Sequence, residues 1–146
     1  MSKYTESSLK FSKNFLIKFD ITNEYLNEIY EEGKKNYLAG RNDEALISFM
    51  SLVIFCPGDR RFHFALGLAL HHAGKYQDAI KYYFASIAIF PYDPRPVAGA
   101  AHCFLALDMH DDARELLQVA IAQSFNDEAY EEVRSICSNT FDKLVK

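Results

Sequence analysis

Apolar residues recur along this chain at intervals of three and four, which is the spacing of an α-helix with one buried face. Over residues 129–141 the apolar positions keep this spacing, and charged side chains occupy the other side. Near the N-terminus, Phe11, Phe15 and Phe19 follow one another at intervals of four. Residues 62–70 are apolar at almost every position, as in a helix that is buried or that lines a binding groove. The pattern predicts helices throughout.

The strongest regularity in the sequence is a repeat with a period of 34 residues. Small residues mark each repeat twice, at points where two helices are expected to cross closely. They are Ala45, Ala79 and Ala113 at one position, and Gly33, Gly67 and Ala101 twelve residues earlier. Gly40 and Gly74 suit a left-handed turn between two helices, and Asp108 takes that place in the third unit. Pro57 and Pro91 end the second helix of a unit.

A 34-residue unit with these marks resembles the tetratricopeptide repeat. We therefore predict an all-α fold, with three tandem tetratricopeptide repeats in a right-handed α-solenoid. The expected helices cover residues 23–38, 42–55, 60–73, 76–89, 94–107 and 110–123. Asn126 and Asp127 can cap a further helix, which would cover the apolar face that a last repeat exposes.

We expect a single domain of 146 residues in three parts. These parts are an N-terminal helical arm at 1–21, the three repeats at 22–125, and a capping helix with its tail at 126–146.

Composition narrows the functional classes. Apolar residues make up 49% and charged residues 25%, as is usual for a soluble globular protein. The net charge of −4 argues against a nucleic-acid partner, which would call for a basic face. The uncharged stretches are too short for a membrane span, and no secretory signal opens the chain, so we expect no stable membrane association. Cys56, Cys103 and Cys137 fit no zinc or redox spacing and favour a reducing compartment.

The first helix of each unit should carry two stripes when positions are counted from Leu26, Arg60 and Pro94. Positions 4, 7, 8 and 11 are expected to pack inward, and positions 2, 5, 9 and 12 to line the concave side of the superhelix. The concave stripe consists of Asn27, Tyr30, Lys34, Tyr37, Arg61, Phe64, Leu68, His71, Arg95, Ala98, His102 and Leu105.

The composition of this concave stripe predicts a function. A face that meets only water would be mostly charged, whereas this one is largely apolar with a cationic rim. We expect a groove that accepts about seven residues of an extended peptide, at ~3.3 Å per residue. The alternative is that these side chains form the core of a compact bundle without a groove.

Three further features resemble a particular family. They are Tyr30 and Tyr37 followed by Gly40, the Asp59-Arg60-Arg61-Phe62 run, and the Asp93-Pro94-Arg95-Pro96 run. Together with the length, the acidic character and the terminal helices, they resemble the class II chaperones of bacterial type III secretion. The resemblance covers residues 22–125.

The resemblance implies a chaperone in the bacterial cytoplasm, without a cofactor, whose partners are the secreted translocator proteins. In that family the concave groove holds a short extended segment with spaced Pro and Leu anchors, and Tyr30 and Tyr37 match the family's groove tyrosines. The family commonly dimerises through its N-terminal region. The resemblance therefore implies a homodimer interface at Phe11, Phe15, Leu16 and Phe19.

Other classes fit less well. Five histidines could serve an enzyme, but no HExxH, GxSxG or Cys/His signature accompanies them, so we expect no catalytic or metal site. An adaptor that clamps a peptide C-terminus would need Lys and Asn side chains in the groove, and only cations are present there. A chaperone for needle subunits, or another peptide-binding adaptor with these repeats, remains an alternative. Residues 9–19 could also form a helix on a membrane surface.

Overall fold

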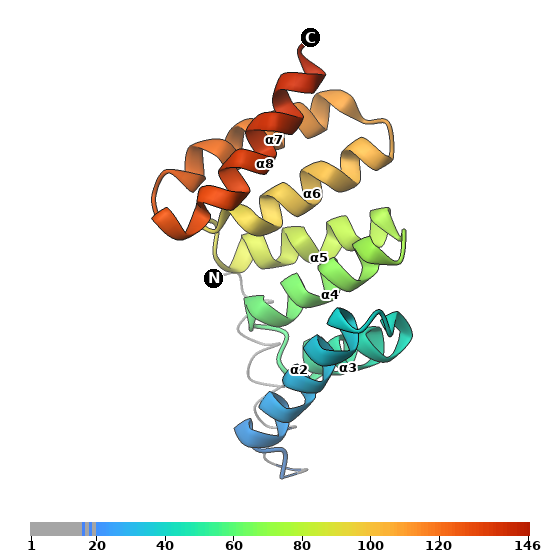
Figure 1. The fold of residues 1–146 in the computed structure, drawn as a ribbon. Coiled ribbons are helices and arrows are strands. Elements are labelled where there is room, and N and C mark those ends of the chain that lie inside the picture. Colours follow the sequence, from blue (N-terminus) through green and yellow to red (C-terminus); the bar gives the residue numbers. More distant parts are fainter. Residues whose placement is uncertain (1–15, 17, 19) are drawn as a thin grey trace.

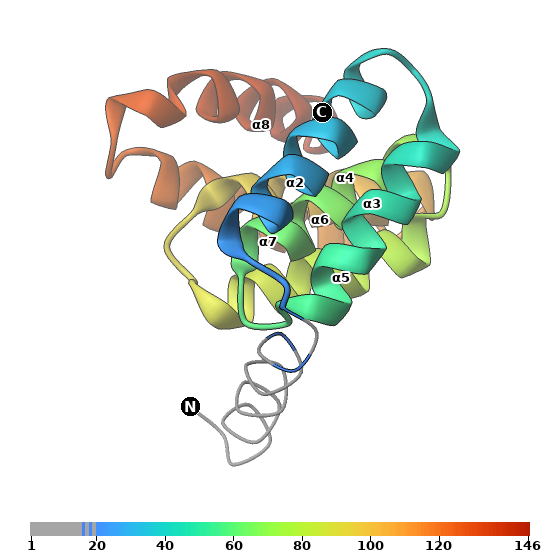
Figure 2. The same ribbon diagram turned by 90° about the horizontal axis from the view of Figure 1, so that it is seen from below.

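Helical hairpins stack one upon another in the computed structural model, which describes Leu16, Lys18 and residues 20–146. The first hairpin consists of α2 (Asn23–Leu38) and α3 (Asn42–Phe55), and the second of α4 (Arg60–His72) and α5 (Tyr76–Ile89). The third consists of α6 (Pro94–Ala106) and α7 (His110–Ser124). A short 3-10 turn, η1 (Glu128–Tyr130), leads into α8 (Glu131–Leu144). Figure 1 shows the hairpins following one another along a single axis, and Figure 2 views the stack from its first hairpin.

The six helices predicted from the repeat agree with the structure to within one residue at each end. The all-α solenoid of tetratricopeptide repeats is therefore confirmed for the described residues. Of the N-terminal arm expected at 1–21, the structure describes Leu16, Lys18, Asp20 and Ile21. The backbone N–H of Ile21 donates to the carbonyl oxygen of Leu16 at 2.9 Å.

A side chain caps the N-terminus of the first helix in every described hairpin. Thr22 accepts a hydrogen bond from the backbone N–H of Tyr25, at the start of α2. Asp59 and Asp93 cap α4 and α6 in the same way, by accepting from the N–H two residues later. Each cap satisfies one of the N–H groups that a helix leaves without an internal partner.

The turns inside the hairpins need the left-handed backbone that the sequence predicted. Gly40 and Gly74 have φ values of 77° and 76°, and Asp108 has a φ of 59°. Glycine adopts this conformation without steric cost, and Asp is among the few other residues that tolerate it. The third hairpin thus keeps the geometry of the first two although it lacks their glycine.

Two apolar clusters follow each other along the stack. The first joins α2 to α6 and includes Phe49, Leu66 and Tyr83. The second joins α6, α7 and α8, and includes Cys137. Burial raises the pKa of the Cys103 thiol to about 12 and that of Cys137 to about 11, so both act as small apolar residues.

Tyr83 connects the second hairpin to the third. Its side chain is 0% exposed, and its ring lies against Gly67 of α4 and Gly99 of α6. A Cβ on Gly67 would approach the ring to 2.8 Å, and one on Gly99 would approach it to 2.5 Å. Real Cβ atoms do not come this close, so both positions must lack a side chain for the ring to fit. Phe49 repeats the contact in the first hairpin, where it lies against Gly33.

The inward stripe is buried in the second unit and fails at one position in the first. Leu66, Gly67 and Leu70 are buried as predicted, whereas Glu32 at the matching position of α2 is exposed. The prediction that Glu32 packs inward was wrong because α2 belongs to the first of the described hairpins. A helix in the middle of the stack packs against the hairpin before it, whereas the corresponding side of α2 is exposed to solvent.

The contact of Tyr83 with Gly67 leads to a stability prediction. In an open helix Gly→Ala would stabilise by ~1 kcal/mol. Here we expect Gly67→Ala to destabilise by about 1–3 kcal/mol, because the new methyl group overlaps the ring. Chemical denaturation followed by circular dichroism measures the change.

The matched control is the same substitution in a Tyr83→Leu background, where the shorter side chain leaves room for the methyl group. The cost of Gly67→Ala should be much smaller there. An equal cost in both backgrounds would show that the ring is not the cause.

Candidate functional site: an apolar groove with a cationic end

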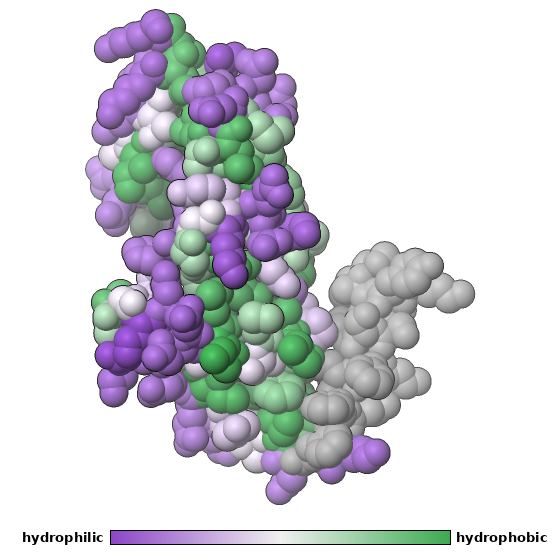
Figure 3. Space-filling view, turned by 90° about the vertical axis from the view of Figure 1, so that its right-hand side faces the viewer, coloured by the Kyte–Doolittle hydropathy of each residue, from purple (hydrophilic) through white to green (hydrophobic). Residues whose placement is uncertain are grey.

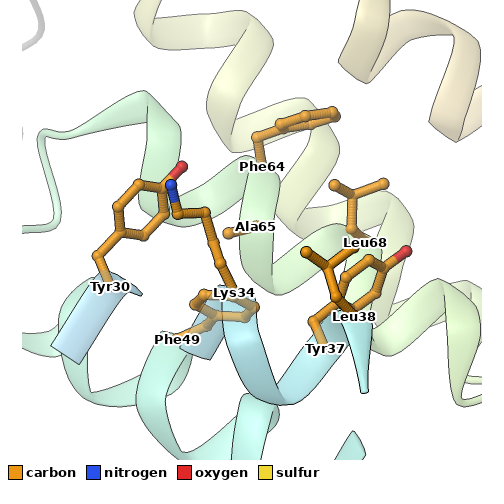
Figure 4. A pocket seen from close by; sticks show the side chains of 8 residues that line it. All are labelled: Tyr30, Lys34, Tyr37, Leu38, Phe49, Phe64, Ala65 and Leu68. Atoms are coloured by element: carbon orange, nitrogen blue, oxygen red, sulfur yellow. The ribbon is translucent and has the colours of Figure 1, made fainter. Parts of the chain in front are cut away.

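Helices α2 and α4 face each other across a hollow of about 510 Å³ that is open to solvent. The side chains around it are almost wholly apolar. They are Tyr30, Lys34, Tyr37, Leu38, Phe49, Phe64, Ala65 and Leu68. Figure 4 shows Tyr30 at one end of this apolar hollow and Tyr37, Leu38 and Leu68 together at the other, with the small Ala65 between them. The hollow therefore offers room between two aromatic ends.

Five of the twelve predicted groove residues meet in the apolar hollow: Tyr30, Lys34, Tyr37, Phe64 and Leu68. The four apolar ones are half-buried. A compact bundle, the alternative considered from the sequence, would have sealed them completely. In the first two units the concave stripe lies open.

Sequence reasoning missed three residues of the apolar hollow. Phe49 and Ala65 are buried at its base, and Leu38 stands at its edge with 84% of its surface exposed. Phe49 occupies the same place in its repeat as Tyr83, which was the available signal for a ring facing α2. Leu38 directly follows Tyr37 in the sequence. The exact rotation of α2 about its axis determines which of the two faces the groove, and the helical period does not fix that rotation.

Packing holds the groove tyrosines in place. The ring of Tyr30 lies 5.4 Å from that of Phe62 and 6.2 Å from that of Phe49, between centroids. The amine of Lys34 lies 4.7 Å above the same ring and 2.8 Å from Glu31. The ring of Tyr37 meets His72 edge-on at 5.7 Å. The groove is thus lined by rings that already have their contacts before a ligand arrives.

A second hollow of about 640 Å³ adjoins the first and shares Tyr30 and Phe64 with it. Its other lining residues are mostly charged: Arg60, Arg61, Ser86, Asp93 and Arg95. The predicted residues Arg61 and Arg95 therefore stand at a cationic hollow beside the apolar one. The two hollows together form one groove whose character changes from apolar to charged.

Two matching Asp–Arg pairs position the cations. The Arg61 side chain donates from Nε to Oδ1 of Asp59 at 3.1 Å and from Nη2 to Oδ2 at 2.7 Å. Arg95 binds Asp93 in the same way, at 2.9 Å and 2.6 Å. Such two-point contacts fix the plane of a guanidinium group.

The same contacts change the acidity of Asp93. Burial by itself would favour the protonated form, but the hydrogen bonds from the Arg95 side chain and backbone outweigh it. The pKa of the Asp93 carboxyl therefore lies below its ordinary value. Arg60 contributes from the other side, with Nη1 at 3.6 Å from Oδ2 of Asp93.

The remaining predicted residues lie outside the two hollows. Asn27 is exposed at the start of α2, and Leu105 is half-buried near the end of α6. His71 Nδ1 and the hydroxyl of Tyr83 form a hydrogen bond of 3.0 Å. Burial lowers the pKa of His71, and the nearby His102 and His72 lower it further, which favours the neutral ring.

Helix α8 covers part of the concave stripe in the third unit. Ala98 is buried in the cluster that includes Cys137 of α8. His102 donates from Nδ1 to the carbonyl oxygen of Ala98 at 2.7 Å, and its Nε2 lies 3.4 Å from Oγ1 of Thr140. The open groove is therefore formed by α2, α4 and the start of α6.

Phe11, Phe15 and Phe19, which were predicted to form a dimer interface, lie outside the described residues. Leu16 is described, is half-buried, and packs against the first apolar cluster of its own chain. Large apolar side chains stay exposed on the first hairpin, where Leu38, Ile47 and Ile54 are each at least 67% exposed. Figure 3 shows hydrophobic residues gathered at the height of this hairpin on one face of the molecule.

Metal and membrane features were also sought. Among residues 16, 18 and 20–146, no three His, Cys, Asp or Glu side chains come together as they would around a metal ion. Within the same residues, no helix combines the length and the apolar character that crossing a bilayer requires.

Comparisons with known proteins agree with this architecture. The family model of the tetratricopeptide repeat matches residues 70–137. No curated protein sequence matches the chain. Among solved structures, a chain of the CopN–Scc3 complex is 27% identical, with a TM-score of 0.79 over 86% of this chain and 74% of that one.

Two further structures contain bound peptides. PcrH from Pseudomonas aeruginosa, in complex with the chaperone binding region of PopD, is 25% identical, with a TM-score of 0.83 over 86% of this chain and 94% of that one. The fold of this chain, with its tetratricopeptide repeats, is thus similar to the folds of PcrH and of the type III secretion translocator chaperone SycD. The chaperone SycD from Yersinia enterocolitica, in complex with a peptide of the translocator YopD, shares this tetratricopeptide-repeat fold at 24% identity. Its TM-score is 0.81 over 85% of this chain and 95% of that one.

The low pKa of Asp93 predicts an acid-sensitive contribution to the stability of the repeats. A carboxyl whose folded pKa is depressed stabilises the fold above its unfolded pKa of about 3.9, and this stabilisation is lost as the pH falls further. Asp93→Asn keeps a helix cap but removes the charge. We expect it to destabilise by about 1–2 kcal/mol at pH 7, and this difference from wild type should shrink as the pH falls below about 3.9.

Urea denaturation of both proteins between pH 3 and pH 7 measures the difference. Asp111→Asn removes a carboxylate from an exposed site on α7 and serves as the control, with the acid profile of the wild type. A difference for Asp93→Asn that is constant over this pH range would contradict the assignment.

Proposed function

We propose that this protein is a chaperone for translocator proteins of type III secretion and that it works in the bacterial cytoplasm. It holds an extended apolar segment of its partner in the groove between α2, α4 and the start of α6. The observation that carries the proposal is the open apolar hollow between Tyr30 and Tyr37. It occurs in a fold shared with PcrH and SycD, whose structures include bound translocator segments.

The apolar hollow suits a branched or ring-shaped aliphatic anchor such as Leu or Pro. Its lining residues are held by their mutual packing, so little order has to be imposed when a ligand binds. Complete burial of a Leu side chain contributes about 1.5–3 kcal/mol. Two or three such anchors along a segment of about seven residues would yield a stable complex at ~3.3 Å per residue.

Holding a segment in this way needs no chemistry. A translocator that inserts into membranes exposes apolar surface and aggregates when it is free. A partner that binds the soluble form shifts the equilibrium toward it by mass action. The seven concave residues that line the two hollows are proposed as the binding surface, with Tyr30, Tyr37, Phe64 and Leu68 at its centre.

We also propose that the free chaperone is a homodimer that uses the N-terminal Phe11, Phe15, Leu16 and Phe19. The first hairpin supports this proposal because Ile47 and Ile54 expose apolar surface next to the start of the stack. A dimer would remove this surface from water.

The groove is tested by substitutions at its centre. Tyr30→Ala, Tyr37→Ala and Phe64→Ala should each weaken binding by about 2 kcal/mol where the residue contacts an anchor. A charge in the apolar hollow, as in Tyr37→Asp or Phe64→Asp, should abolish the complex. The measurement is co-expression with the translocators of the same operon, followed by affinity purification and sizing.

Phe125→Ala is the matched control, because it removes a ring that is 69% exposed at the end of α7, outside both hollows. It should leave the complex intact. The groove proposal is overturned when all central variants fold, by circular dichroism, and still bind as tightly as the wild type.

The dimer is tested separately. Phe11→Asp combined with Phe15→Asp should convert the protein to a monomer, because charges in an apolar interface are costly to bury. Light scattering after size exclusion measures the mass in solution. A dimeric variant, or a wild-type protein that is monomeric at every concentration, would contradict this part of the proposal.

A further inference from the structure

The cationic hollow is a preorganised site that apolar anchors alone do not explain. The Arg61 guanidinium lies 5.6 Å from the centroid of the Tyr30 ring, and that of Arg95 lies 5.9 Å from the centroid of the Phe64 ring. Tyr30 and Phe64 also line the apolar hollow. The two arginines therefore lie next to the rings that would contact an apolar anchor, on the side of the cationic hollow.

The same local device occurs twice, 34 residues apart. In each case an Asp caps the helix, and two residues later an Arg folds back onto the carboxylate of that Asp. The carboxylate holds the guanidinium near the groove mouth, which reduces the entropy that a ligand would otherwise have to remove. The second and third repeats thereby each present one oriented Arg near the start of their first helix.

Charge and donor groups remain available at this site. Arg60, Arg61 and Arg95 face two carboxylates, those of Asp59 and Asp93, which leaves an excess of one positive charge among these five. The hydrogen bonds that join the two pairs use Nε and Nη2 of Arg61 and Arg95. In the described part of the chain, Nη1 of these two arginines has no carboxylate partner. Their side chains are 54% and 49% exposed, so a ligand can reach them.

This local charge is opposite in sign to that of the protein. The whole chain carries a net charge of −4, which repels an acidic ligand everywhere except where cations gather. Charge complementarity therefore selects a carboxylate. A nucleic-acid backbone would need a cationic face much larger than this site.

We propose that the cationic hollow binds the side-chain carboxylate of an Asp or Glu in the partner segment, within two residues of an apolar anchor. This inference rests on the proposed peptide-binding function and adds a charge requirement to it. Side chains two residues apart in an extended strand point to the same side and are about 6.6 Å apart. The arginines lie 5.6 Å and 5.9 Å from the two shared rings, so an acid and an anchor at this separation can reach both hollows.

The experiment selects ligands without assuming a client. Random ten-residue segments, displayed between flanking domains so that neither end is free, are selected on three proteins. These are the wild type, the Arg61→Gln/Arg95→Gln double variant, and Arg114→Gln, which removes a cation of α7 outside both hollows. Selected segments are then synthesised with acetylated and amidated ends, and binding is measured by calorimetry for each peptide and for its Asp→Asn or Glu→Gln version.

The wild type and Arg114→Gln should enrich an acidic residue within two positions of Leu or Pro. Neutralising this acid should weaken binding to the wild type by roughly threefold to tenfold, and should change nothing with the double variant. Arg61→Lys/Arg95→Lys, which keeps the charge, should retain most of the acid preference. Circular dichroism checks that each variant is folded.

Four results would overturn the inference. Enrichment of apolar segments without acids would refute it and leave the proposed function standing, whereas failure to select any segment would refute both. An equal loss on neutralising the acid in the wild type and the double variant would show that the arginines do not read the charge. A free C-terminal carboxylate that replaces the internal acid, tested with unblocked peptides, would also contradict the assignment to a side chain.

Discussion

The architecture depends on an aromatic ring that occupies the space two glycines leave. Tyr83 of α5 fits between Gly67 of α4 and Gly99 of α6, and Phe49 makes the same contact with Gly33 of α2. Because a ring fills the crossing in each of the first two hairpins, the second helix there holds the first at a fixed distance. Dense packing of this kind has discrete arrangements, so the first helices stay in register along the stack. These rings therefore also set the distance between the first helices, which carry the concave stripe.

The groove follows from this scaffold. The inward side of α4 is used for packing, so Phe64 and Leu68 on its concave side are only half-buried. They meet Tyr30 and Tyr37 of the preceding unit across an open hollow. Asp59 and Asp93 start their helices and at the same time orient the arginines at the groove mouth. One set of residues thus serves both helix formation and the surface offered to a ligand.

The sequence was sufficient to predict the helices because a 34-residue period repeats the same turn and crossing residues, and each of these has a local physical cause. It also predicted the two rows of side chains that meet in the apolar hollow, since the helical period alone decides which positions share a face. It could not predict that Ala98 and His102 lie under α8, because that contact joins segments that lie far apart in the chain. Glu32 was misplaced for a related reason, since periodicity does not reveal which helix comes first in the stack.

Helix α8 also has a consequence for assembly. It shields the end of the third hairpin, while apolar side chains at the opposite end, on α2 and α3, remain exposed. A protein with one exposed apolar end and one covered end can form a dimer through the exposed ends. The dimer then has no apolar end left to which a third molecule could add. Shielding by α8 therefore favours closed complexes over open-ended fibres, a safeguard for a protein built from stackable units.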